Sequence, residues 1–150
     1  MKYDFSDYQK MYDLSASDLS KSIFDFSAGI SGFQAEAIKR GVQVVSADAS
    51  QLPHFQYKAH QFDLALCTDF IFYHSHSTKE IAELVEELCR IASEVRIFPL
   101  MDKTGKASKE LGPLMLILQK KNYGVEVRSS VFENGNAMLR IWEQECKVGV

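Results

Sequence analysis

The chain has 150 residues, which is enough for one domain with a single core. Its apolar fraction of 46% and charged fraction of 25% are those of an ordinary globular protein. The net charge of −3, with no cluster of lysine and arginine, argues against a partner held through phosphates and hence against nucleic acid.

The cysteines and the N-terminal residues narrow the class further. Cys67, Cys89 and Cys146 are widely separated and form no C-x-x-C pair, so neither a zinc site nor a redox pair is indicated. Residues 1–21 lack the apolar core of a signal peptide, and no apolar stretch approaches the length of a membrane span. We therefore expect a cytoplasmic protein with no membrane contact and no metal.

The first elements alternate as strand and helix. Residues 1–20 predict a helical segment, and from residue 20 onward short apolar runs alternate with helical patterns, which is typical of a parallel sheet covered by helices. The first run is "SIFDFS". A helix is expected over residues 32–40, with Ser31 and Gln34 as a capping box and Gly41 at its end.

The middle of the chain continues this alternation. "VQVVSAD", residues 42–48, is β-branched and ends on an acid. "FDLALCTDFIF", residues 62–72, is a near-continuous apolar run that predicts a strand buried on both faces, with its C-terminal half as strand or loop. Residues 77–95 predict a helix with Ser77 and Glu80 as a second capping box. Its apolar face consists of Ile81, Leu84, Val85, Leu88, Ile91 and Ala92.

The C-terminal third ends the sheet differently. "EVRIFPL" predicts a strand stopped by Pro99, and residues 113–121 predict a helix. "VEVRSSVFE" and "AMLRIWEQ", residues 125–133 and 137–144, are expected strands joined by "NGN", a strong hairpin signal. The sequence therefore predicts an α/β fold: a Rossmann-like, three-layer α/β/α single domain over residues 1–150, with a mixed sheet and a C-terminal antiparallel hairpin.

This order of elements resembles the class I S-adenosylmethionine-dependent methyltransferases, whose sheet also closes with an antiparallel hairpin. "IFDFSAGISGF" resembles their first motif, an acid-x-Gly-x-Gly-x-Gly loop, and "VVSADAS" resembles the end of their second strand, nineteen residues past Gly29. "LPHFQYKAHQFDLALCTDFIFY" is similar to the stretch that leads into their fourth strand. "EIAELVEELCRIASEVRIFPL" resembles the helix and fifth strand that follow, so the resemblance covers residues 20–142.

Two departures from the family pattern stand out. Ser27 and Ser31 take the places of two glycines in the loop, whereas Gly29, the glycine most useful for close backbone approach, is present. Only fourteen positions separate Asp48 from Phe62, where the family normally places a helix, a third strand and often another helix. We therefore expect a shortened fold that lacks this strand and its crossover helix.

The resemblance implies an S-adenosylmethionine site at the carboxyl ends of the strands. Asp69, after the presumed fourth strand, would act as a base or hold a substrate amine, or else caps the turn. Asp25 would anchor the loop or contact the cofactor indirectly. The cofactor-binding residues implied are Asp25, Ser27, Ala28, Gly29, Ser31, Asp48, Ala49 and Thr68.

The role of Asp48 has two interpretations. Its distance from Gly29 matches the acid that hydrogen-bonds the ribose hydroxyls, whereas its local string, "ADASQLP", resembles the acid that contacts the adenine amine. The spacing favours the ribose. The N-terminal segment is ambiguous as well: Phe5, Tyr8 and Tyr12 either cover the cofactor as a lid or pack on the sheet. His74 and His76 are expected in a solvated loop.

Three functions compete. The first is methyl transfer from S-adenosylmethionine to a small molecule or a protein. The second is an inactive, shortened form of the fold whose exposed edge, "VQVVSA", forms a homodimer or binds another protein. The third, a nucleotide-binding oxidoreductase, is disfavoured by the hairpin and the incomplete glycine motif. A cavity around residues 49–61 favours the first function, and tight packing of that stretch on the sheet argues against catalysis.

Overall fold

The computed structural model describes most of the chain, and the ranges matter for the site. It describes residues 3–27, 32–48, 50, 52, 54–72, 76–102, 104–130, 132 and 137–144. The predicted cofactor contacts of Ala28, Gly29, Ser31 and Ala49 lie outside the described residues, as does His74.

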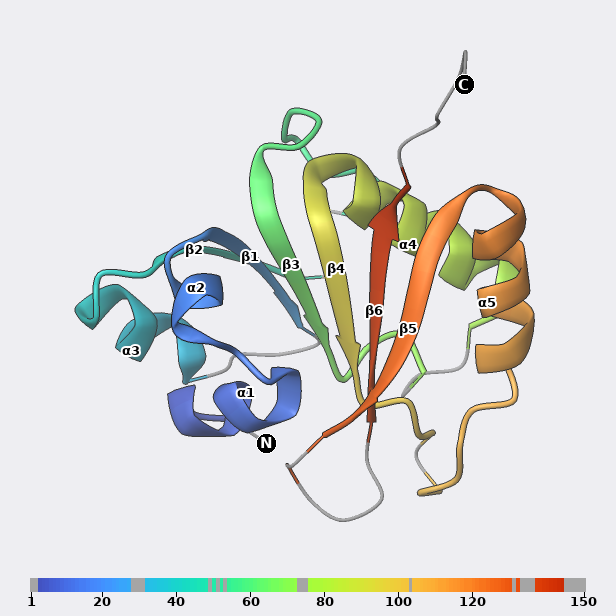
Figure 1. The fold of residues 1–150 in the computed structure, drawn as a ribbon, viewed down its shortest axis with the longest axis horizontal. Coiled ribbons are helices and arrows are strands. Elements are labelled where there is room, and N and C mark those ends of the chain that lie inside the picture. Colours follow the sequence, from blue (N-terminus) through green and yellow to red (C-terminus); the bar gives the residue numbers. More distant parts are fainter. Residues whose placement is uncertain are drawn as a thin grey trace.

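The centre of the fold is a six-stranded sheet with the strand order β2-β1-β3-β4-β6-β5 (Figure 1). The first four strands are parallel, and β6 runs antiparallel to both β4 and β5. The predicted mixed sheet is therefore confirmed. The strands are β1 (Ser22–Ser27), β2 (Gln43–Ala47), β3 (Phe62–Thr68), β4 (Ala92–Phe98), β5 (Tyr123–Ser129) and β6 (Ala137–Glu143).

Helices cover both faces of the sheet, which confirms the three-layer architecture (Figure 1). α1 and α3 pack on the face that carries Ile23, Leu64 and Leu66, and α4 and α5 pack on the face that carries Phe24 and Phe26. Alternate residues of each strand thus contribute to two separate cores. The helices are α1 (Phe5–Tyr12), α2 (Ala16–Leu19), α3 (Phe33–Lys39), α4 (Thr78–Ile91) and α5 (Leu111–Lys120).

The sequence predicts capping boxes at α4 and α3. At α4, Ser77 N–H donates to Glu80 Oε1 at 2.9 Å and Glu80 N–H donates to Ser77 Oγ at 3.1 Å, which confirms the predicted capping box. At α3 the N-cap is Gly32, and Ser31 of the predicted capping box lies outside the described residues. The N–H of Gly32 donates to the Tyr3 carbonyl at 2.7 Å, a contact with the distant N-terminal segment that local spacing cannot reveal.

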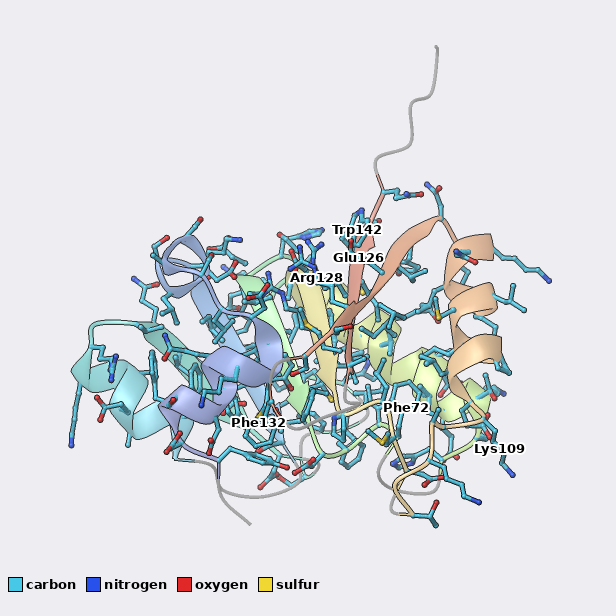
Figure 2. All side chains as sticks on the ribbon, turned by 60° about the horizontal axis from the view of Figure 1, so that its bottom comes forward. Phe72, Lys109, Glu126, Arg128, Phe132 and Trp142 are labelled. Carbon is cyan, nitrogen blue, oxygen red and sulfur yellow. The ribbon has the colours of Figure 1, made fainter. Side chains whose placement is uncertain are left out.

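The C-terminal strands pair as predicted, but their connection is longer than an Asn-Gly turn. Ser129 pairs with Ala137, so residues 130–136 form the connection and the predicted strand over 125–133 is wrong at its end. The Ser130 hydroxyl hydrogen-bonds to the carbonyls of Lys10 and Met11, at 3.1 and 3.2 Å, which directs the chain toward α1. Figure 2 shows Phe132, within this connection, on the side of the molecule where α1 lies.

The connection from β2 to β3 bears out the expected deletion. Its described residues contain no strand and no α-helix, and β2 lies at the edge of the sheet. The chain therefore passes from β2 across β1 to β3 through a short crossover on the α4 face, where Phe55 packs on Phe24. Among the described residues of this connection there is thus neither the third strand of the full family pattern nor its crossover helix, as the spacing predicted.

The aromatic face of the N-terminal segment lies in the core. Tyr8, Met11 and Tyr12 are fully buried, and Tyr8 stacks on Phe33 of α3 with ring centroids 4.3 Å apart. This is the packed alternative for Phe5, Tyr8 and Tyr12, and α1 thereby joins α3 to the sheet. A role as a lid over a ligand stays a prediction.

Candidate functional site

The carboxyl ends of β1, β2 and β3 meet at one edge of the sheet. The strand register pairs Phe26 with Ala47 and Ser27 with Thr68, so Asp48 and Asp69, one residue further on, follow strand ends at this same edge. After β1 the chain forms β2 on one side of β1, and it then returns to form β3 on the other side of β1. The strand order therefore reverses at β1, which is a topological switch point. Open α/β sheets bind ligands in the crevice at such a point.

Asp25 is buried beneath the N-terminal helix. Its side chain accepts hydrogen bonds from the Tyr8 hydroxyl at 3.0 Å and from Ser46 Oγ at 3.3 Å, and the residue is 1% exposed. The carboxylate thus ties α1 and β2 to β1 instead of facing solvent.

Thr68 is likewise tied to the N-terminal helix. The Tyr12 hydroxyl donates to the Cys67 carbonyl at 2.8 Å and lies 2.7 Å from Thr68 Oγ1. Burial, together with the nearby Tyr8, raises the pKa of Tyr12 well above its ordinary value, so the phenol stays protonated and remains a donor. α1 therefore fixes the ends of both β1 and β3.

Asp48 is an exposed carboxylate at the end of β2. It accepts a hydrogen bond from the backbone N–H of Ser50 at 2.9 Å. Hydrogen bonds from the Ser50 side chain and backbone lower the pKa of Asp48, so the group is ionised at neutral pH. A charged acceptor in this position suits a ligand with neighbouring hydroxyl groups.

Asp69 terminates β3 in the left-handed backbone region, with φ of 54°. Its N–H donates to the Phe98 carbonyl at 3.0 Å, which joins the ends of β3 and β4. Short polar residues tolerate this conformation better than most others do. The backbone leaves the sheet sharply here and passes into Phe70 and Ile71.

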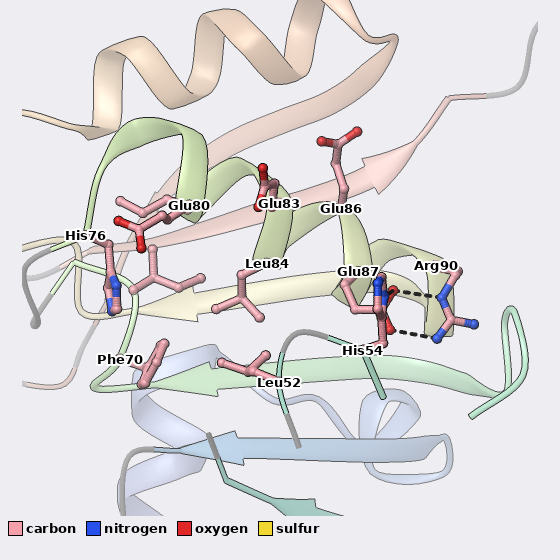
Figure 3. A pocket seen from close by; sticks show the side chains of 12 residues that line it. Leu52, His54, Phe70, His76, Glu80, Glu83, Leu84, Glu86, Glu87 and Arg90 are labelled. Carbon is pink, nitrogen blue, oxygen red and sulfur yellow. Dashed lines mark hydrogen bonds and ion pairs between the residues drawn. The ribbon is translucent and has the colours of Figure 1, made fainter. Parts of the chain in front are cut away.

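A groove of about 690 Å³ opens beside these strand ends and runs along α4 (Figure 3). Phe70, which directly follows Asp69, lies at one end of the groove with His76 and Glu80, and Leu52 and Leu84 lie near the middle (Figure 3). His54, Glu87 and Arg90 lie at the other end. The lining residues are Leu52, His54, Phe70, Ile71, His76, Glu80, Ile81, Glu83, Leu84, Glu86, Glu87 and Arg90.

The crossover from β2 to β3 forms one wall of this groove and is held by α4. Phe55 is 3% exposed, with its ring 5.0 Å from that of Phe24 and 5.6 Å from that of Phe26. Leu52 and His54 face the groove. The sequence left two arrangements open for this crossover, packing on the sheet or lining a cavity. The structure has both, because Phe55 packs on the sheet and Leu52 and His54 line the groove.

Glu87 and Arg90 fix the backbone of the crossover. Glu87 accepts the N–H of Phe55 at 2.8 Å, and Arg90 donates to the carbonyls of Phe55 and Tyr57 at 3.0 and 2.9 Å. The hydrogen bonds from Arg90 lower the pKa of Glu87 despite its burial. Sequence reasoning missed this pair. The available signal was an acid, Glu87, on the buried side of an otherwise apolar helix face.

The described residues hold no group of three or more histidine, cysteine or acidic side chains able to bind a metal. His76 lies at the groove with its ring 4.9 Å from that of Phe70. No helix within the described ranges is long and apolar enough to cross a membrane.

Comparisons with known proteins agree on the fold. No family model and no curated protein sequence matches the chain. The small RNA methyltransferase HEN1 superposes with a TM-score of 0.51 and 13% identity, over 92% of this chain and 24% of that one. The present chain thus matches about a quarter of HEN1 and has the class I methyltransferase-like fold in shortened form.

Two further solved structures are similar over most of their length. One is an S-adenosylmethionine-dependent methyltransferase from Thermotoga maritima, described as a possible histamine N-methyltransferase, with a TM-score of 0.47, 15% identity and coverage of 95% of this chain and 90% of that chain. The other is a Thermoplasma acidophilum protein, with a TM-score of 0.46, 10% identity and coverage of 94% and 88%.

Proposed function

We propose that this protein binds S-adenosylmethionine at the carboxyl edge of β1, β2 and β3 and transfers its methyl group to a small-molecule or protein acceptor. The observation that carries the proposal is the placing of Asp48, an exposed and ionised acid, at the same strand-end edge as Asp69, which directly precedes Phe70 of the groove. The methyltransferase-like fold supports it.

The described residues fit the parts of the cofactor. The carboxylate of Asp48 would accept from the two ribose hydroxyls, and Leu52 and Phe70 of the groove would contact the adenine ring. The groove volume of about 690 Å³ lies within the range usual for cofactor sites. Ser27, at the end of β1, lies toward the loop that would hold the amino-acid part.

When bound, S-adenosylmethionine supplies a methyl group carried on a sulfonium. Methyl transfer depends chiefly on alignment of the acceptor, and Asp69 is the acid best placed to orient an acceptor or take its proton. The backbone bond between Asp69 and Phe98 fixes the position from which it does so.

Replacing Asp48 by asparagine is expected to weaken binding of S-adenosylhomocysteine, the reaction product, by about 10- to 100-fold. Asparagine keeps an oxygen for the Ser50 N–H, so the turn survives, but the charged acceptor is lost, at about 1.5–3 kcal/mol. Isothermal titration calorimetry of both proteins measures the change. Asp63→Asn is the matched control. Asp63 bonds to Ser22 at the amino ends of the strands, away from Asp48, so its substitution should leave the affinity unchanged.

The alternative function predicts a different result. If the folded wild-type protein gives no heat with either S-adenosylmethionine or S-adenosylhomocysteine, the chain has kept the fold without the cofactor and acts as a binding module. Wild-type binding that Asp48→Asn does not change would instead overturn the ribose role of Asp48.

A further inference from the structure

β2 is an edge strand without the usual protection of an edge. It pairs with β1, and no described strand lies on its other side. Its sequence, "QVVSA", contains no charge and no proline, and its pairing with β1 is regular, without a bulge. Natural edge strands are generally protected by a charge, a proline or a bulge, because their free backbone groups otherwise pair readily with another strand.

Exposed apolar side chains flank this edge on both faces of the sheet. Val45 is 38% exposed and pairs with Phe24, which places it on the α4 face. Ile38 of α3 is 56% exposed and belongs to the opposite face. A partner at this edge would therefore gain apolar contacts as well as backbone hydrogen bonds.

Glu36 of α3 and Arg40, its C-cap, bind each other and lie toward α1. Glu36 and Arg40 form an ion pair at 2.9 Å, and the guanidinium of Arg40 lies over the Phe5 ring of α1 at 4.3 Å. Ile38 lies midway between them in sequence and therefore on the other side of the helix. β2 and Ile38 themselves carry no charge, and the charges that flank them are Lys39 and Arg40 before β2 and Asp48 after it, so a pairing of β2 with its own copy opposes no like charges within the strand.

We propose that a second copy of this chain pairs with β2 in antiparallel fashion, giving a homodimer with one continuous sheet. A register centred on Val45 places Val45 against its copy, Val44 opposite Ser46 and Gln43 opposite Ala47, with no like charges opposed. A two-fold axis perpendicular to the sheet keeps both α3 helices on one face, so the two Ile38 side chains approach each other. This interface does not depend on cofactor binding.

β5, the strand at the other edge of the sheet, carries charged residues that β2 lacks. β5 carries Glu126 and Arg128, which form an ion pair at 3.0 Å, and charges of this kind protect an edge strand. Val127 between them is 46% exposed, slightly more than Val45. Val127 therefore provides a matched control for Val45, at an edge where we expect no pairing.

Sedimentation velocity across a concentration series tests the dimer. We expect wild-type protein to change from the 17.0 kDa chain mass to twice that mass at micromolar concentrations. Val45→Lys should remain monomeric at roughly 100 μM, a loss of at least about tenfold in association, because it opposes two like charges at the axis. Val127→Lys should dimerise as wild type does. A monomeric wild type over the whole series, or a dimer broken by Val127→Lys and not by Val45→Lys, would overturn the proposal.

Disulfide trapping tests the register independently of any loss of folding. In a Cys146→Ser background, the remaining native thiols, Cys67 and Cys89, are buried. Oxidised Val45→Cys should give a covalent dimer, because position 45 meets its own copy. Gln43→Cys should give little, because position 43 lies opposite position 47. Equal trapping at both positions would contradict the register, and no trapping at either would contradict the interface.

Discussion

Replacing Arg96 by methionine is expected to lower the free energy of unfolding by about 3–5 kcal/mol, the usual cost of breaking a buried ion pair. Arg96 is 4% exposed, on β4 beneath the N-terminal segment. Its guanidinium donates to Asp18 at 3.1 and 3.3 Å, to Glu94 at 2.6 Å and to the Tyr12 carbonyl at 2.9 Å. Methionine fills much of the same space but removes this donor from all three acceptors, so that Asp18 keeps Lys21 and Glu94 keeps Arg140 as the remaining cation.

Thermal and urea unfolding measure the effect of Arg96→Met. A loss of this size corresponds to a decrease in Tm of roughly 10 °C for a domain of this length. Arg128→Met is the control, since Arg128 forms exposed ion pairs with Asp13 and Glu126 and should change stability by less than about 1 kcal/mol. Adding Asp18→Asn to Arg96→Met should cost less than the sum of the two changes. Equal losses for Arg96→Met and Arg128→Met would contradict the buried network.

The same network makes stability depend on pH. Burial opposes ionisation of Asp18, but hydrogen bonds from the Ser15 backbone and from Arg96 outweigh it and lower the pKa of Asp18 from 3.8 to about 2. Because the folded-state pKa is the lower one, this contribution is present above pH 3.8 and is lost as the pH falls toward 2. Arg96→Met should flatten the pH dependence of stability in this interval.

Replacing Phe55 by alanine is expected to cost about 3–5 kcal/mol and to weaken S-adenosylhomocysteine binding as well. The Phe55 ring is buried and packs on Phe24, and its backbone is hydrogen-bonded to Glu87 and Arg90. Phe55 therefore holds the short crossover on the sheet. Without the ring, the sheet surface under the crossover loses its cover. Leu52, three residues earlier, then loses the support that places it at the groove.

Urea unfolding and calorimetric titration of Phe55→Ala measure both effects below the unfolding transition. Leu116→Ala is the control: Leu116 is 61% exposed on α5, so stability should change by no more than about 0.5 kcal/mol and affinity not at all. An unstable Phe55→Ala variant that binds S-adenosylhomocysteine as wild type does would show that the crossover supports the fold but not the site.

The fold was largely predictable because its strongest signals are local. The alternation of apolar runs and capped helices gave every strand of the sheet, the cap of α4 and the end of α3 at Gly41. The error at the C-terminal hairpin lies where a distant contact is made. Ser130 binds the end of α1, and the hairpin connection is longer than the Asn-Gly signal predicts.

The candidate site was less predictable for the same reason. Spacing brought Asp48 and Asp69 to one edge, because the ends of parallel strands converge whatever the loops do. That Asp25 is buried depends on where Tyr8 packs, and the groove depends on a pair, Glu87 and Arg90, whose partners are more than thirty positions away. Arg96 and Asp18, 78 positions apart, leave no mark on local sequence pattern.

The most direct test of cofactor binding at this edge is a titration of ¹⁵N-labelled wild-type protein with S-adenosylhomocysteine, followed by NMR. The proposal predicts saturable shifts of the amide signals of Ser46, Ala47 and Asp48 and of Thr68, Asp69 and Phe70, with smaller shifts at Leu52. Amides at the opposite edge, such as Ser22 and Asp63, should not move. Unchanged spectra at millimolar ligand, or shifts confined to residues away from the strand ends, would contradict a cofactor site in this shortened fold.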